Sequence, residues 1–144
     1  MAKYIFHCSA AWMLMTASAQ ASANVSCRID DAFLGFELEA IAGRTSPITQ
    51  VQIGTISIKP AAAKLTTPRL TFDRGNILQQ WDYDGDLRLQ IEAGTDAAKE
   101  YVNLVILARL NEKTDKYSGR YVLKVTYAGG TKELKGRIRK CVAG

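Results

Sequence analysis

Cysteines and a group of basic side chains near the C-terminus are the residues of this chain whose types and positions could do chemistry. Cys27 and Cys141 lie near the two ends, and Cys8 lies in the N-terminal segment. In an oxidising compartment an isolated pair of cysteines is typical of a disulfide, and the alternatives are free thiols or two ligands of a metal. We predict a Cys27–Cys141 disulfide, which would stabilise the fold by about 4–5 kcal/mol in the chain-entropy model.

Basic residues alternate with other residues in the last two apolar runs of the chain. Lys135, Arg137 and Arg139 share one face of the final run, and Arg120 and Lys124 point outward from the run before it. If the runs pair as a hairpin, these five residues form one cationic patch. Such a patch predicts an anionic partner: a cell-envelope lipid, a polysaccharide or an acidic protein. The alternative is a solvated outer face whose charges discourage association between sheet edges.

Several chemistries lack the residues that they need. His7 is the only histidine, and it lies in the N-terminal segment. Ser-His-Asp and Cys-His catalysis, and histidine-bound zinc or haem, all require a histidine. The chain also has no glycine-rich loop of the Walker or dinucleotide-binding type. The sequence therefore predicts no enzyme, no cofactor and no metal, and a carboxylate pair or a Ser-Lys pair would be the only catalytic options.

Acidic residues gather at one turn. Asp82, Asp84 and Asp86 belong to an Asp-Tyr-Asp-Gly-Asp stretch that invites a calcium interpretation. A calcium-binding EF-hand loop has glycine at its sixth position and glutamate at its twelfth. Here Gly85 is fourth and Ala93 is twelfth. We therefore favour a β-turn with solvated carboxylates, and Asp-Gly between alternating runs is itself a strong hairpin signal.

The N-terminus has the three parts of a secretory signal peptide. Lys3 precedes a short apolar stretch, and Ala-x-Ala sites follow it, with cleavage possible after Ala19, Ala21 or Ala23. The apolar stretch is shorter than the roughly 20 residues that span a bilayer. We predict a signal peptide over residues 1–23 and one domain over residues 24–144, exported to the periplasm or beyond. Removing Lys3 from 19 basic residues, against 14 acidic ones, leaves a formal net charge of +4.

The elements that must position these residues are strands. Apolar residues recur at every second position, which is the mark of half-buried strands, in most of the runs between turn signals. The run 101–110 could instead belong to a buried helix over residues 96–111, but its β-branched residues and strict alternation favour a strand. The predicted strands cover residues 24–29, 35–41, 51–59, 70–72, 77–83, 86–92, 101–110, 119–127 and 131–141.

Seven to nine short strands without a long helix predict an antiparallel all-β domain. In an up-and-down barrel of about eight strands, the first and last strands pair, which would bring Cys27 beside Cys141. An immunoglobulin-like sandwich is the alternative, although its cysteines normally link strands in the middle of the chain. The barrel interior would hold large side chains or one small ligand. The aromatic residues expected to fill it are Phe36, Phe72, Trp81, Tyr121 and Tyr127.

One short motif resembles a known family. Ser118-Gly119-Arg120-Tyr121 is similar to the Ser-Gly-x-x-Tyr motif of the membrane-bound and periplasmic C-type lysozyme inhibitors, with one residue instead of two before the tyrosine. The resemblance covers four residues and implies a periplasmic inhibitor with this motif on its inhibitory surface.

We expect an exported, non-catalytic binding protein that engages a protein or an anionic envelope component, and not nucleic acid, through the face carrying the basic patch. The alternatives are a carrier of a small apolar ligand and a protein resembling the lysozyme inhibitors.

Overall fold

The computed structural model describes residues 23–43, 48–83 and 85–143, which form nine β-strands and one short 3-10 helix. Asp73 caps this helix, because its side chain accepts a hydrogen bond from the Gly75 amide. The elements are β1 (Ala23–Asp30), β2 (Leu34–Ala42), β3 (Ile48–Ile58), β4 (Arg69–Thr71), η1 (Arg74–Asn76), β5 (Ile77–Tyr83), β6 (Asp86–Thr95), β7 (Glu100–Asn111), β8 (Lys116–Tyr127) and β9 (Gly130–Ala143).

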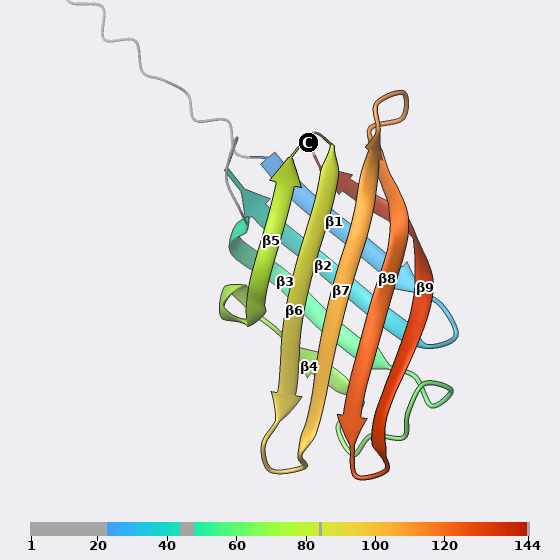
Figure 1. Ribbon diagram of the computed structural model, residues 1–144. Helices are drawn as coiled ribbons and strands as arrows, with labels where there is room; N and C mark the ends of the chain where they lie inside the picture. The colour runs from blue at the N-terminus through green and yellow to red at the C-terminus, as the bar shows by residue number, and fades with distance from the viewer. Residues whose placement is uncertain (1–22, 44–47, 84, 144) are drawn as a thin grey trace, which may run out of the picture.

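All nine strands belong to one antiparallel sheet with the order β4-β3-β2-β1-β9-β8-β7-β6-β5. The sheet curls over, so that β5 to β9 cross in front of β1 to β4 (Figure 1). The predicted all-β architecture is confirmed, and so is the pairing of the first strand with the last. The strands form a single sheet and not the two sheets of an immunoglobulin-like sandwich.

The curl is a half-barrel with nine strands and not a closed barrel of about eight. Its two ends are β4 and β5. β4 is only three residues long and pairs with three residues of β3, so it offers β5 almost no edge to pair with. Across this seam the side-chain oxygen Oε1 of Gln80 accepts a hydrogen bond from the Ile48 amide at 2.8 Å.

The core lies inside the curl and is formed by every second residue of the long strands. Phe36 and Phe72 stack there with ring centroids 5.8 Å apart, and Tyr121 is fully buried. The prediction that Trp81 fills the interior is wrong: its side chain is 57% exposed, because it alternates outward on the terminal strand β5. The inward side chains contact one another in one continuous cluster.

The loop between β3 and β4 covers one end of the core. Ala62 and Ala63 are buried in it. The buried carboxylate of Glu100, at the start of β7, accepts hydrogen bonds from the amides of Thr66 at 2.6 Å and Thr67 at 3.1 Å. The Thr66 amide is the main reason why the pKa of Glu100 lies below its usual value. One carboxylate therefore ties this loop to the opposite part of the sheet.

The run that was ambiguous between strand and helix is β7, which pairs along its whole length with β8. The predicted signal peptide lies outside the described residues, except for Ala23, which begins β1. The cleavage positions Ala19 and Ala21 also lie outside them, as does Asp84 at the predicted hairpin turn. The described residues include no helix with the length and apolarity needed to cross a bilayer.

Candidate functional site

The disulfide joins the two strands at the centre of the sheet. Cys27 of β1 and Cys141 of β9 lie directly opposite each other and are bonded, 114 residues apart in sequence, as predicted. Arg28 follows Cys27, and Lys140 precedes Cys141. These two residues form the next cross-strand pair, and both are exposed. The disulfide therefore fixes the spacing of two positively charged side chains on the outer face.

A register shift in β9 decides which way Cys141 points. Between the pairs Tyr117–Cys141 and Gly119–Ile138, β9 contains one residue more than β8. Strict alternation from buried Ile138 would send Lys140 inward and Cys141 outward. The extra residue instead leaves Cys141 buried and both Arg139 and Lys140 exposed. A β-bulge re-aims side chains in this way, and here it places two adjacent cations on the surface.

The five predicted basic residues share the outer face of the β8–β9 hairpin, and all five are exposed. The half near the hairpin turn is compensated by an acid. Lys124 lies opposite Glu133 in the register, and Lys135 forms an ion pair with Glu133 at 3.4 Å. Glu133 therefore offsets one of the two lysines at this end of the hairpin.

The other half of the hairpin has no such compensation. Arg120 lies directly opposite Arg137, and Arg139 follows on the same face. Arg28 and Lys140 extend this group onto β1. We call these five residues (Arg28, Arg120, Arg137, Arg139 and Lys140) the basic cluster.

None of the basic cluster makes an ion pair or a side-chain hydrogen bond within the part of the chain that the structure describes. Glu37 of β2 lies in register with Arg28 but forms no ion pair with it. In contrast, Arg88 and Arg109 both form ion pairs with Asp86: the nitrogen–oxygen distance is 3.2 Å for Arg88 and 4.0 Å for Arg109. Among the described residues the cluster is thus not part of a surface ion-pair network.

A cleft opens beside the basic cluster. The ladder between β1 and β9 has four residue pairs and ends at Arg28–Lys140, although β1 continues to Asp30. Beyond that pair the two strands separate and leave a depression of about 660 Å³. We call it the basic cleft; its lining residues are Arg28, Ile29, Asp30, Asp31, Arg137, Arg139 and Lys140.

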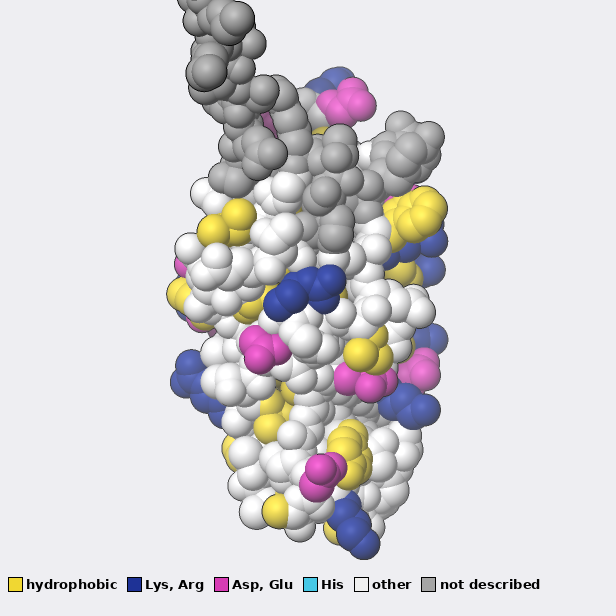
Figure 2. Space-filling model, turned by 90° about the vertical axis from the view of Figure 1, so that its left-hand side faces the viewer, with side chains coloured by type: hydrophobic (Ala, Val, Ile, Leu, Met, Phe, Trp, Pro, Cys, Tyr) yellow, Lys and Arg dark blue, Asp and Glu magenta, His cyan; other side chains and the backbone are white. Residues whose placement is uncertain are grey.

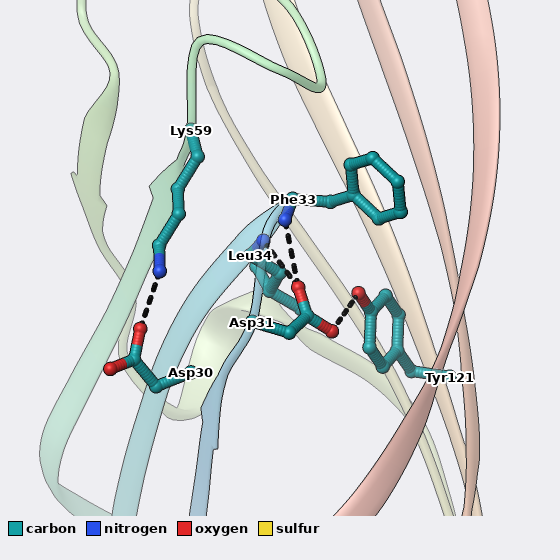
Figure 3. A network of polar contacts seen from close by, with 6 residues as sticks. All are labelled: Asp30, Asp31, Phe33, Leu34, Lys59 and Tyr121. Carbon is teal, nitrogen blue, oxygen red and sulfur yellow. Dashed lines mark hydrogen bonds and ion pairs between the residues drawn. The ribbon is translucent and has the colours of Figure 1, made fainter.

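The two carboxylates of the cleft are engaged by other residues, as Figure 3 shows. Asp30 pairs with Lys59 at 2.5 Å. The Lys59 hydrogen bond holds the pKa of Asp30 below its usual value, and the charges of Arg28 and Lys140 act in the same direction. These two cations therefore act on Asp30, the carboxylate of the cleft that lies on their face of the sheet.

Asp31 faces the inside of the curl. Its Oδ2 accepts a hydrogen bond from the Tyr121 hydroxyl at 2.6 Å (Figure 3). Its Oδ1 accepts hydrogen bonds from the backbone amides of Phe33 at 2.8 Å and Leu34 at 3.0 Å. Burial acts to raise the pKa of Asp31, but these hydrogen bonds outweigh it and the pKa is lowered. The bond to Tyr121 links the β1–β2 turn to β8 from the inside, where β1 and β9 have separated.

Tyr121 owes its position to a glycine on the neighbouring strand. It pairs with Gly136 of β9, and a side chain at Gly136 would overlap the Tyr121 ring. Burial, followed by the hydrogen bond to Asp31, raises the pKa of the Tyr121 hydroxyl. In the motif that resembles the lysozyme inhibitors the tyrosine is therefore a core residue, and Ser118 and Arg120 are its exposed side chains.

Among the side chains that the structure describes, acidic residues form no comparable site. Asp86 is paired with arginines, and the side chains of Asp82 and Asp84 lie outside the described part of the structure. No group of three or more potential metal ligands occurs among the described residues.

The face of the molecule turned to the viewer in Figure 2 carries charged side chains of both signs and hydrophobic side chains among neutral ones. The exposed apolar residues of β5 are Leu78, at 53%, and Trp81, at 57%.

Searches of family models, curated proteins and solved structures return no significant match to this chain.

Sequence reasoning missed Arg28 and Lys140. The signal that could have found them is their position next to the two bonded cysteines.

Proposed function

We propose that this chain is an exported, non-catalytic binding protein that engages an anionic component of the cell envelope through the basic cluster on β1, β8 and β9. The observation that carries the proposal is the cross-strand pair Arg120–Arg137, with two like charges opposite each other and no acid paired with either among the described residues. Like charges at directly opposed positions destabilise a sheet. Binding sites often contain residues that lower the stability of the fold, and a partner-binding role would account for keeping these two opposed charges.

Edge protection is the alternative explanation of the basic cluster, and it does not account for Arg120. Lysine and arginine often protect exposed sheet edges from pairing with other strands. Here β1, β8 and β9 are internal strands, and the ends of the sheet are β4 and β5. Arg120 lies on β8, which is paired on both sides, and has no edge to protect. β9, in contrast, pairs with β1 only over residues 140–143 among the described residues, so edge protection applies to Arg137 and Arg139 and does not explain Arg120.

Export is supported by two independent features. The disulfide is typical of proteins in oxidising compartments. The N-terminal sequence has the composition of a secretory signal. An envelope presents abundant anionic groups, and a surface rich in Lys and Arg gains about 1 kcal/mol for each such residue near an anionic membrane.

The other candidate functions have less support. A carrier of an apolar ligand needs room inside the curl, where the inward side chains pack against one another. A lysozyme inhibitor using Tyr121 needs that side chain at the surface, and it is buried. The proposal therefore places the partner on the outer face.

Two double variants of equal charge test the proposal. Arg137→Gln with Arg139→Gln removes two charges from the basic cluster, and Lys124→Gln with Lys135→Gln removes two from the half that Glu133 compensates. Binding is measured by co-sedimentation with vesicles of phosphatidylcholine with and without phosphatidylglycerol.

We expect the wild type to bind only the anionic vesicles. At about 1 kcal/mol per residue, the Arg137/Arg139 variant should bind about 30-fold more weakly, and the control variant should lose clearly less. Equal losses would mean that net charge alone drives binding, and an unchanged affinity in both variants would exclude this face.

A further inference from the structure

The basic cleft concentrates positive charge in a concave place and not on a flat strand face. Three arginines and one lysine line about 660 Å³ of space where β1 and β9 separate. A flat face can attract any polyanion, whereas a concave group of cations can surround one compact anionic group. Arginine adds geometric selectivity, because its planar fork binds two oxygens of a phosphate or carboxylate at once.

We propose that the basic cleft binds a phosphate group, as a phosphomonoester headgroup or as free phosphate. This inference rests on the proposed function and names the anion that one part of the basic cluster receives. A phosphomonoester carries up to two negative charges at neutral pH and three acceptor oxygens. It can therefore accept hydrogen bonds from several cations at once, which one carboxylate can do only in part.

The two acids of the cleft do not cancel its charge. Lys59 neutralises Asp30. Asp31 is turned inward, where both of its oxygens accept hydrogen bonds from the protein. The four cations have no ion-pair partner among the described residues, so their donors remain available to a ligand.

The fold holds the cleft in shape from two sides. The Cys27–Cys141 bond fixes the last β1–β9 pairs beside Arg28 and Lys140, against the repulsion between those two charges. The Tyr121–Asp31 hydrogen bond ties β8 to the β1–β2 turn beneath the separated strands. A site whose side chains are held in place before binding loses less entropy when the ligand arrives.

The test uses a variant that changes the cleft but leaves Arg120, Arg137 and Arg139 of the basic cluster. Arg28→Gln with Lys140→Gln is compared with the wild type and with the Lys124→Gln/Lys135→Gln control. Each is bound to vesicles containing phosphatidic acid, whose headgroup is a phosphomonoester, and to phosphatidylglycerol vesicles adjusted to the same surface potential. Inorganic phosphate is titrated separately, with amide shifts followed by NMR. Thermal unfolding and the mass of the oxidised protein verify that each variant is folded.

We expect the wild type to prefer phosphatidic acid. The cleft variant should lose about 30-fold in affinity for phosphatidylglycerol, because two charges of the basic cluster are removed, and clearly more in affinity for phosphatidic acid, so that the preference disappears. Competition by millimolar phosphate, with shifts confined to the cleft, would assign free phosphate as the ligand; a vesicle preference without it would assign the headgroup.

Equal binding of both vesicle types by the wild type, or equal losses for both types in the cleft variant, would overturn this inference and leave the proposed function standing. Failure to bind either vesicle would overturn both.

Discussion

Replacing Arg137 by glutamine should make the protein more stable. Arg137 lies directly opposite Arg120, and its neighbours along the same face are Lys135 and Arg139. Opposed charge pairs on a sheet change stability by roughly 0.2–1 kcal/mol. Because Arg137 is surrounded by like charges, we expect a gain of about 0.5–1 kcal/mol, or about 2–4 °C in Tm for a domain of this size.

The stability gain should depend on salt, since it comes from repulsion between exposed charges. The Debye length falls from about 10 Å at 0.1 M ionic strength to about 3 Å at 1 M. The assay is urea unfolding of the wild type and Arg137→Gln at low salt and in 1 M NaCl, with disulfides intact. The difference between the two proteins should be largest at low salt and nearly absent at high salt.

Two control variants separate charge from other effects. Arg137→Lys keeps the charge and should leave stability nearly unchanged. Lys124→Gln removes a cation that faces Glu133 and should give no gain or a small loss. A loss of stability in Arg137→Gln, or a gain that persists unchanged in 1 M salt, would refute the reasoning that the cluster is electrostatically strained.

Removing the disulfide by Cys27→Ala with Cys141→Ala should lower the free energy of unfolding by about 4–5 kcal/mol, because the bond joins residues 114 apart in sequence. Denaturant unfolding measures this loss. A loss under about 1 kcal/mol would contradict the stabilising role of the disulfide. Tyr121→Phe should cost about 1–3 kcal/mol at neutral pH. The pKa of Asp31 is lowered in the folded protein, so the stabilisation from its hydrogen bond with Tyr121 is fully present above the ordinary pKa of 3.8 and is lost as the pH falls through the lowered pKa. The stability difference between variant and wild type should therefore shrink in acid. A stability difference that stays constant with pH would argue against this interaction. Glu100→Gln should release the loop before β4, which would be seen as faster amide hydrogen exchange in that loop. The effect should be largest at neutral pH, because the pKa of Glu100 is lowered and the stabilisation by its carboxylate disappears only in acid. Unchanged exchange at neutral pH would show that other contacts hold the loop.

Local alternation predicted most of the strands, because the side-chain period of a half-buried strand is written directly in the sequence. The pairing of the first and last strands followed from Cys27 and Cys141, which had to be close in any fold that bonds them. The exposed faces of β8 and β9 also followed from alternation, which is why the five predicted cations do share one face.

The incomplete closure of the sheet could not be predicted, since it depends on tertiary packing around a strand of three residues, β4. The position of Lys124 opposite Glu133 depends on the exact hairpin register, and an alternation pattern leaves that register open. The ion pair between Lys135 and Glu133 does not, because the two residues are neighbours on one face of β9. The bulge at Arg139 and Lys140 had one sequence signal. Buried Ile138 and Cys141 are three residues apart, a spacing that regular alternation does not allow. Trp81 was assigned to the core by size alone, although strand position decides its exposure.

The central claim is that an anionic partner meets the protein at the basic cluster. NMR mapping of amide signals with anionic phospholipid nanodiscs tests this location directly. We predict that the largest shifts and broadening fall on Arg28, Arg120, Arg137, Arg139 and Lys140 and weaken as salt is added. Perturbations centred instead on Leu78 and Trp81 of β5, or spread evenly over the surface, would contradict the account.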